Sequence, residues 1–517
     1  MTLDAPIGTE CHMGLSSLTV GDPARLPPET QEPYVPGQKT RATHPVATVA
    51  ALCFGGLMAA LTQTMVIPIQ GELPRLLSST ADNTAWVVTI TLLCGAVTMP
   101  ISGRLADMVG KQRVLIGSTV LLLVGSVVAA LSSSLAPMLV GRGLQGLAMG
   151  FIPVGIALLR AVVPPQMAST AVAAMSATLG VGGAIGLPLS AWIVQVGNWH
   201  LLFWISAVVA ALVLVAVAVL VPHTHDAEPG SFDLRGAVGL ALGLVLFLVG
   251  LSKASTWGWG SGRTIGFLVG GLVVLVAWGA MQLRTREPLV DLRSTARLPV
   301  LLTNLAAVAI GMGMMAMSIV VPQLLELPDQ LGYGLGQTIL QAGLWMAPGG
   351  LMMMIFSPVS SRLIDTIGAK VTLMVGASVL GAGYLVALAL MGTPWQLMIA
   401  VIVISTGVGI GYAAMPTLIL DATPPREAAS AVGVNTLMRS LGTTVAAALM
   451  GTILTSSTTA LGPVQVPSEG AFQVCFVIGA VAAFVGVAII ALIPRVRGTS
   501  GDAAVGAVPE TVSAAAH

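Results

Sequence analysis

The sequence of 517 residues contains little charge: Asp, Glu, Lys and Arg together make up 8% of it, whereas hydrophobic residues make up 55%. Soluble domains carry about 25% charged residues, so this chain has too little charge to cover a water-exposed surface. The solvent around most of the protein is therefore expected to be lipid. The net charge of +1 indicates nothing about partners, because the distribution of charge matters more than its sum.

Motifs for metals, disulfides and nucleotides are also missing. The four Cys show no CxxC spacing and three of them lie in apolar runs, which is typical of small buried side chains. The six His show no zinc pattern, and no GxxxxGK[ST] loop indicates ATP as the energy source. A membrane enzyme would need His or acids clustered at membrane depth, and a receptor would need a folded soluble domain. We expect neither, and no metal, cofactor or nucleic-acid partner.

The sequence does contain a series of long apolar runs. A helix needs about 20 apolar residues to cross a membrane, and by this rule the chain has about fourteen spans. Helices are favoured over a β-barrel because the runs do not alternate in polarity. The predicted spans cover residues 46–69, 86–106, 112–132, 137–161, 168–194, 201–222, 234–253, 264–284, 299–323, 337–361, 370–392, 394–421, 428–456 and 470–494.

The Lys and Arg residues predict the orientation of these spans. With both termini inside, only Arg75, Lys253 and Arg263 fall in outer loops, and Arg142 and Arg439 fall within spans. The other cations lie on or next to the inner side, which is the positive-inside pattern. We therefore expect a multi-pass protein of the cell membrane with both termini in the cytoplasm.

Two stretches of the sequence occur twice. PISGRLADMVG at 100–110 matches PVSSRLIDTIG at 358–368, and PPQMASTAV at 164–172 matches PPREAASAV at 424–432. Because the two offsets are nearly equal, we predict two related six-helix bundles that enclose a substrate path and rock about it. The predicted parts are a disordered cytoplasmic tail at 1–44, a bundle at 45–222, a linker with two extra helices at 223–298, a second bundle at 299–495 and a disordered cytoplasmic tail at 496–517.

The loop after the second span gathers charge in a chain that has little of it. Gly103 and Gly110 permit a tight turn, and Asp107 can pair with a cation or sit near a helix N-terminus. The same spacing recurs at 361–368, so we predict that this loop bridges the two halves when the inner side is shut. Lys111 and Arg113 could equally be orientation signals only. The predicted gating residues are Gly103, Arg104, Asp107, Gly110, Lys111, Arg113, Arg362, Asp365 and Gly368.

These stretches resemble the major facilitator superfamily. The run GRLADMVGKQR at 103–113 is similar to the loop signature of that family, and RGLQG at 142–146 is similar to its membrane Arg motif. Residues 232–259 resemble the linker and first extra helix of its fourteen-helix drug:proton antiporter branch. The resemblance covers residues 45–495 and implies an all-α major facilitator fold that exports drugs in exchange for protons.

The fifth span resembles the motif that marks antiporters in this family. The residues that carry the resemblance are Gly180, Gly183, Gly186 and Pro188. Two departures weaken the transfer of the family's proton site to this chain. The branch places an Asp in the first span where this sequence has Thr62, and Pro188 is displaced by one position from the antiporter motif. A passive facilitator therefore stays open as an alternative.

Charged residues inside spans are costly, so they are candidate functional residues. Arg142 lies beside Gln145 in the fourth span; it either hydrogen-bonds helix ends or, as the resemblance implies, takes part in proton coupling. Arg439 lies in the thirteenth span, with Asn435 one turn earlier on the same face. Asp421, at the end of the twelfth span, is either an ordinary boundary charge or a titrating partner of an Arg.

The sequence places no acid in the middle of a span, which argues against a pocket for multiply charged cations. Met-rich runs at 312–318 and 351–356 suit bulky apolar molecules, although each Met alone could serve packing or face lipid. The predicted pocket residues are Gln63, Trp86, Gln323 and Trp345.

Together these features predict a monomeric secondary transporter in the lipid bilayer. It would export hydrophobic drugs or antibiotics by proton antiport through alternating access, with protons as the coupling ion. The alternatives are export of a lipid or of a self-made secondary metabolite, and a proton-independent facilitator.

Overall fold

The computed structural model describes Ala42 and residues 44–70, 72–196, 198–223, 230–461 and 464–494. Both predicted tails, apart from Ala42 and His44, lie outside the described residues. Within the described part, 13 helices are long and apolar enough to cross a membrane. A bent pair of helical segments, Pro165–Gly183 and Pro188–Val194, raises the number to 14 if the pair is one span. The prediction of an all-α membrane protein with about fourteen spans is confirmed.

The first half of the chain contains six spanning elements, which correspond to the first six predicted spans. They are α1 (Pro45–Thr64), α4 (Trp86–Val109), α5 (Lys111–Ala130), the continuous run of α6 (Leu135–Leu147), η2 (Ala148–Gly150) and α7 (Phe151–Val162), then α8 (Pro165–Val196) and α9 (His200–Leu220). The short turns η1 (Ile67–Ile69), α2 (Leu73–Leu76) and α3 (Ala81–Thr84) connect α1 to α4. The first helix ends before the predicted residue 69, in keeping with Pro68, which has no N–H to continue the ladder.

The linker and the second half also consist mainly of long helices. The inserted helices are α10 (Leu234–Trp257) and α11 (Gly262–Gln282), with the short α12 (Leu292–Thr295) after them. The second bundle comprises α13 (Leu298–Glu326), η3 (Asp329–Leu331), α14 (Ile339–Ile367), α15 (Ala369–Ala389), α16 (Pro394–Ala422), η4 (Pro425–Glu427), α17 (Ala428–Ser456) and α18 (Glu469–Ala491). An unpredicted hairpin of β1 (Thr458–Leu461) and β2 (Val464–Pro467) pairs Thr458 with Pro467 between α17 and α18.

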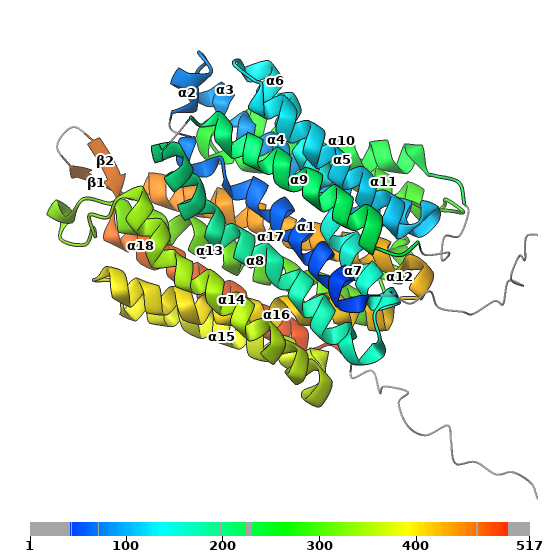
Figure 1. Cartoon of the computed structure of the whole chain (residues 1–517). Coiled ribbons are helices and arrows are strands. Elements are labelled where there is room, and N and C mark those ends of the chain that lie inside the picture. Colours follow the sequence, from blue (N-terminus) through cyan, green and yellow to red (C-terminus); the bar gives the residue numbers. More distant parts are fainter. Residues whose placement is uncertain are drawn as a thin grey trace, which may run out of the picture. The chain divides into compact units, whose positions relative to one another are not determined.

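The two halves meet along two seams, each formed by one helix from either half. In one seam α4 packs against α17, and in the other α8 packs against α14 (Figure 1). The helices α4 and α14 carry the first repeated stretch, and α8 and α17 carry the second. Each seam therefore joins equivalent parts of the repeat, as expected for two related bundles facing each other.

The inserted helices attach to only one of these seams. Helix α10 packs against α4 and α17, and α11 packs against α10. Only 11% of the apolar window of α11 is buried, so this helix lies at the periphery with most of its side chains outward. The α4–α17 seam is thus covered by α10.

Close helix crossings inside the bundles depend on glycine. At the crossing of α5 and α6, a Cβ added to Gly125 would lie 2.7 Å from the carbonyl oxygen of Gly141 and 2.9 Å from the amide nitrogen of Gln145. The obstacles are backbone atoms, which cannot rotate away. Small residues at such crossings let backbones approach and so increase van der Waals contact between the helices.

Replacing Gly125 by Ala should therefore force α5 and α6 apart and lower stability by about 1–3 kcal/mol, the usual cost of overpacking. Gly117 on the same helix has open space around its Cβ position, so Gly117→Ala is the matched control and should leave stability unchanged or slightly higher. Thermal unfolding of the two purified variants, followed by fluorescence, checks this. Equal melting temperatures would contradict the packing account.

Candidate functional site

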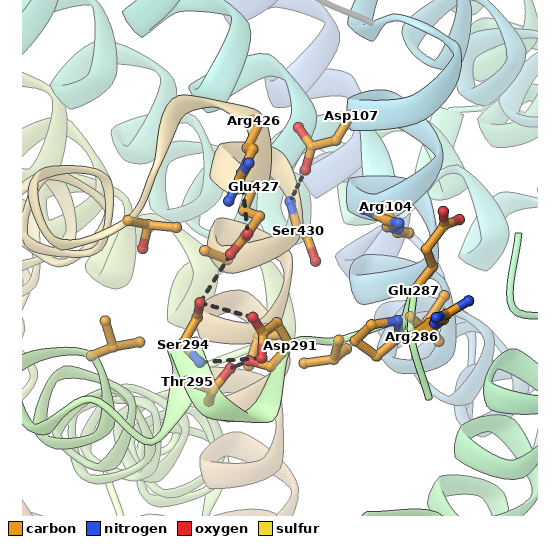
Figure 2. Close-up of a pocket in the computed structure, with 17 residues that line it drawn as sticks. Arg104, Asp107, Arg286, Glu287, Asp291, Ser294, Thr295, Arg426, Glu427 and Ser430 are labelled. Atoms are coloured by element: carbon orange, nitrogen blue, oxygen red, sulfur yellow. Dashed lines mark hydrogen bonds and ion pairs between the residues drawn. The ribbon is translucent and has the colours of Figure 1, made fainter. Parts of the chain in front are cut away.

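Asp107 connects the two halves at the end of the bundle that the charge pattern predicts to be cytoplasmic. It lies near the end of α4, is 4% exposed, and accepts the backbone N–H groups of Ala429 at 3.2 Å and Ser430 at 2.9 Å. These amides belong to the first turn of α17, where a helix leaves N–H groups unpaired and favours negative charge. Figure 2 shows Asp107 pointing from α4 toward Ser430. We call this contact the α4–α17 latch.

The glycines around Asp107 make this approach possible. A Cβ at Gly103 would overlap the backbone of Ala429, so only glycine lets α4 come this close to α17. Gly110 has a φ of 107°, a conformation that favours glycine, and it turns the chain from α4 into α5. The bridge between the halves is therefore a carboxylate on backbone amides rather than a pair of charged side chains.

The repeated stretch in the second half makes the equivalent contact at the other seam. Asp365 of α14 accepts the hydroxyl of Ser169 at 2.7 Å, and the hydroxyls of Ser361 and Thr170 lie 2.8 Å apart. Ser169 and Thr170 belong to the first turns of α8, as Ala429 and Ser430 do in α17, and Gly368 repeats the positive φ at 84°. We call this contact the α14–α8 latch. Asp365 is exposed and holds a hydroxyl, whereas Asp107 is buried and holds two amides.

A third contact between the halves lies at the same end. Arg160 in the last turn of α7 donates to the carboxylate of Asp421 near the end of α16, at 2.5 Å. The two side chains are 36% and 45% exposed. The sequence left two alternatives for Asp421: a boundary charge or a titrating partner of an Arg. The structure places it at the end of its span and pairs it with Arg160.

The remaining predicted gating residues surround the latches. Lys111 is buried at the start of α5, and Arg104 is partly buried on α4. Arg113 is exposed and donates to the carbonyl of Val109 at 3.4 Å, and Arg362 is exposed on α14. Of these four cations, Arg104 lines the crevice described next.

A crevice of about 370 Å³ lies beside the α4–α17 latch, and the linker forms one wall of it. Figure 2 shows Ser294 of α12 directed toward Glu427 at the start of α17, and the two side chains are joined by a hydrogen bond of 3.0 Å. Asp291 caps α12 by accepting the amides of Arg293 and Ser294. The linker therefore docks on the helix that Asp107 also holds.

The two ends of the linker are tied together by Glu287. Its carboxylate accepts both the backbone N–H of Ser231, at 2.5 Å, and the Ser231 hydroxyl, at 2.8 Å. These hydrogen bonds, with a smaller contribution from the positive charge of Arg104, hold the pKa of the Glu287 carboxyl below its ordinary value. The segments before α10 and after α11 are thereby fixed to each other next to α4.

Arg142 is buried at 1% exposure among helix ends near the opposite end of the bundle. Its guanidinium donates to the carbonyls of Thr62 at 2.8 Å and Val87 at 3.2 Å, and to the side chain of Gln145 at 2.7 Å. One guanidinium nitrogen, Nη2, is buried without a hydrogen-bond partner among the described residues. Arg142 thus ties α1 and α4 to α6, and it retains an unused donor.

Asn435 and Arg439 make separate contacts inside the second half. Asn435 donates to the side chain of Asn304 in α13 at 2.9 Å. The guanidinium of Arg439 lies over the ring of Tyr412 in α16, 4.6 Å from its centre. Both residues point into their own bundle and fix α17 to α13 and α16.

The small residues of α8 face two different neighbours. A Cβ at Gly180 would overlap Met353 of α14, and Pro188 lies against Gly343 of the same helix. A Cβ at Gly186 would overlap Thr64 of α1, whereas Gly183 faces open space. Gly180 and Pro188 therefore pack at the seam between the halves, and Gly186 packs against α1 within the first half.

The predicted pocket residues make separate side-chain contacts. Gln63 donates to the sulfur of Met149 at 2.8 Å, and Trp345 donates to Gln337 at 2.9 Å. Gln323 is exposed near the end of α13. Trp86 is the first residue of α4. The ammonium of Lys253 lies over its ring, 5.5 Å from the ring centre. The sequence predicts Lys253 in an outer loop. This prediction is wrong, because α10 continues to Trp257 and Lys253 is buried on it.

Four residues that make contacts between helices are absent from the sequence prediction. Ser169 and Thr170 lie inside the second repeated stretch, so their recurrence was visible although their partners were not. Arg160 and Asn304 carry no local signal, since each acquires its role from a partner distant in the chain: Asp421 and Asn435, 261 and 131 residues away.

Comparison with known proteins agrees with this geometry. The Major Facilitator Superfamily profile matches residues 52–447 and again 303–514. The Tetracenomycin C resistance and export protein of Streptomyces glaucescens is 28% identical over 423 residues, covering 80% of this chain and 76% of that protein. The Lincomycin resistance protein LmrB of Bacillus subtilis is 27% identical over 323 residues, covering 62% and 66%.

Two further comparisons bear on length and fold. An uncharacterized MFS-type transporter of Mycobacterium tuberculosis is 27% identical over 408 residues, or 78% of this chain, and the chain spans 58% of that relative's length. The crystal structure of the human organic anion transporter MFSD10 superposes with a TM-score of 0.61 at 15% identity, covering 86% of this chain and 99% of that one. The resemblance to the drug-efflux branch is supported by relatives named for antibiotic resistance, and the chain belongs to the major facilitator superfamily.

Proposed function

We propose that this protein exports hydrophobic drugs or antibiotics across the cell membrane by alternating access, in exchange for protons. The names of its relatives support this class of substrate, since two of them are a tetracenomycin C export protein and a lincomycin resistance protein. In this proposal the path lies between the predicted bundles 45–222 and 299–495. The chain acts alone as a monomer.

The observation that carries the proposal is the pair of equivalent latches at one end of the seams. Opening the path at that end requires Asp107 to release the amides of Ala429 and Ser430, and Asp365 to release Ser169. Such contacts either form or break, so they give the seam two discrete arrangements. In the closed arrangement the path would open only toward the other side of the membrane.

Arg142 is the proposed coupling residue, because it is a fully buried cation with an unused donor. A proton-independent facilitator is the second candidate, and it is favoured by one observation. Among the side chains whose burial is described, Asp107 is the one buried carboxylate, and it lies on a latch rather than in mid-membrane.

The proton exchange can be tested in inverted vesicles that contain a dye reporting internal acidity. Addition of tetracenomycin C or lincomycin should release protons from an acidified lumen, and Arg142→Ala should abolish the release. Arg142→Lys keeps the charge and checks that the site still folds. Arg263→Ala removes an exposed outer cation and should retain wild-type exchange. Drug uptake that ignores the proton gradient would establish the facilitator instead.

The two latches should differ in strength. Asp107→Asn leaves one oxygen to accept an amide where the carboxylate has two, so about one hydrogen bond is lost. A hydrogen bond to a charged group is worth about 1.5–3 kcal/mol. The closed state should therefore lose roughly ten- to 100-fold in population. Asp365→Asn retains an oxygen for the Ser169 hydroxyl and should change the population only a few-fold. Transport should slow more in Asp107→Asn, with both variants still folded.

The latch prediction is checked by distances between spin labels on the exposed positions Val109 and Arg426, in a background free of other cysteines. The Asp107→Asn sample should show a larger population at long distance than the Asp365→Asn sample. Identical distance distributions in the two variants and the parent would exclude a latch at either position.

The ion pair of Arg160 and Asp421 should contribute little by itself. Both side chains are more than one-third exposed, and exposed pairs are worth about 0.2–1 kcal/mol. A double-mutant cycle with Arg160→Gln and Asp421→Asn, scored by the same closed population, should give a coupling within this range. A coupling of several kcal/mol would instead make this pair a principal part of the gate.

A further inference from the structure

Lys253 is a buried cation to which no function has been given above. It lies one turn before the end of α10 and is 8% exposed. Its ammonium lies 5.5 Å from the centre of the Trp86 ring, and it makes no ion pair within the part of the chain that the structure describes. A cation–π contact offsets only a small part of the hydration that a buried ammonium loses.

A second cation, Arg142 of α6, contacts the same turn of α4. Val87 follows Trp86, and its carbonyl accepts the Nε–H of Arg142 at 3.2 Å. The Nη2 group of Arg142 is fully buried and has no partner among the described residues. Adjacent residues at the start of α4 thus contact two cations from different helices, α10 and α6, and Arg142 retains an unused hydrogen-bond donor.

The described carboxylates do not neutralise these cations. The buried charged side chains are Asp107, Lys111, Arg142, Lys253 and Arg439. Asp107, the one acid among them, is held at the opposite end of α4 by the amides of α17. Buried charges in proteins are normally paired, so the positive charge at the start of α4 favours an anion that comes from outside the chain.

The surroundings of Lys253 are aromatic and apolar. Trp86 belongs to an apolar cluster that also contains Trp257, Phe267 and Leu441, and the Trp257 and Phe267 rings lie 5.5 Å apart. This cluster joins α4, α10, α11 and α17, so it lies where the inserted helix covers the seam between the halves. A molecule bound there would contact both halves, so its contacts would change when the halves move relative to each other.

We propose that Lys253 and Trp86, with the nearby charge of Arg142, bind amphipathic aromatic anions: the ring system packs on Trp86 and the acidic group meets the Lys253 ammonium. This inference rests on the proposed function and names its substrate class. The membrane potential, negative inside, also favours the outward movement of an anion.

The inference is tested by binding, independently of transport, on the full chain in nanodiscs of phosphatidylcholine. The probes are naphthalene-1-carboxylate, its neutral amide naphthalene-1-carboxamide, and 1-naphthylmethylammonium, titrated by calorimetry. The carboxylate should bind about tenfold tighter than the amide, and the ammonium should bind most weakly. Lys253→Met should remove the preference for the carboxylate while the affinity for the amide stays unchanged, which shows that the apolar site is intact.

Two variants control for charge alone. Lys253→Arg should retain the preference, since it keeps a cation at the site. Arg263→Met removes a cation from an exposed position at the start of α11 and should also retain the preference. Equal affinities for carboxylate and amide, tightest binding of the ammonium, or a preference that survives Lys253→Met would each overturn the inference.

A lipid phosphate shares the anionic chemistry and is distinguished by a second set of nanodiscs that contain phosphatidylglycerol. The carboxylate preference should persist there. Its loss would identify a lipid headgroup as the occupant and overturn the assignment to aromatic anions. Because the readout is binding, a failure of drug transport in vesicles would count against the proposed function alone.

Discussion

The first turn of a helix must find partners for its amide groups outside the helix, and in α17 the other half of the molecule provides them. The Asp107 carboxylate accepts two of these amides, and Gly103 allows the backbones to approach closely enough. The closed end of the seam depends on this interaction. It is specific because it needs a carboxylate and a glycine one turn apart on α4 and, opposite them, the start of a helix from the other half.

The repeat makes this arrangement occur twice, but the two copies are not equal. Asp365 is exposed and holds only the hydroxyl of Ser169, whereas Asp107 is buried and lines a crevice that the linker also lines. The linker reinforces the difference, since Ser294 bonds to Glu427 at the start of α17 and α10 covers the same seam. The inserted helices thus add contacts at the α4–α17 seam. The α8–α14 seam is formed by the two bundles without them.

The buried charges of this chain differ from those that the family resemblance implies. Thr62 occupies the place of the branch's first-span Asp, and the carbonyl of Thr62 is a hydrogen-bond acceptor for Arg142. The interior therefore contains cations, held by carbonyls and rings, where the branch has an acid. This balance of charge supports the proposal that the substrates are acidic.

The sequence by itself determined the membrane class, the number of spans, the internal repeat and the family, because hydropathy and recurring motifs are local properties of the chain. It also predicted that Asp107 bridges the halves, since its spacing recurs in the second half. Only the tertiary structure decided which groups meet. Asp107 and its amide partners are 322 and 323 residues apart, and Arg160 and Asp421 are 261 apart. Lys253 became a buried cation because α10 packs onto α4. Such pairings depend on which helix faces touch, and this is set by the packing of the whole bundle rather than by any one segment.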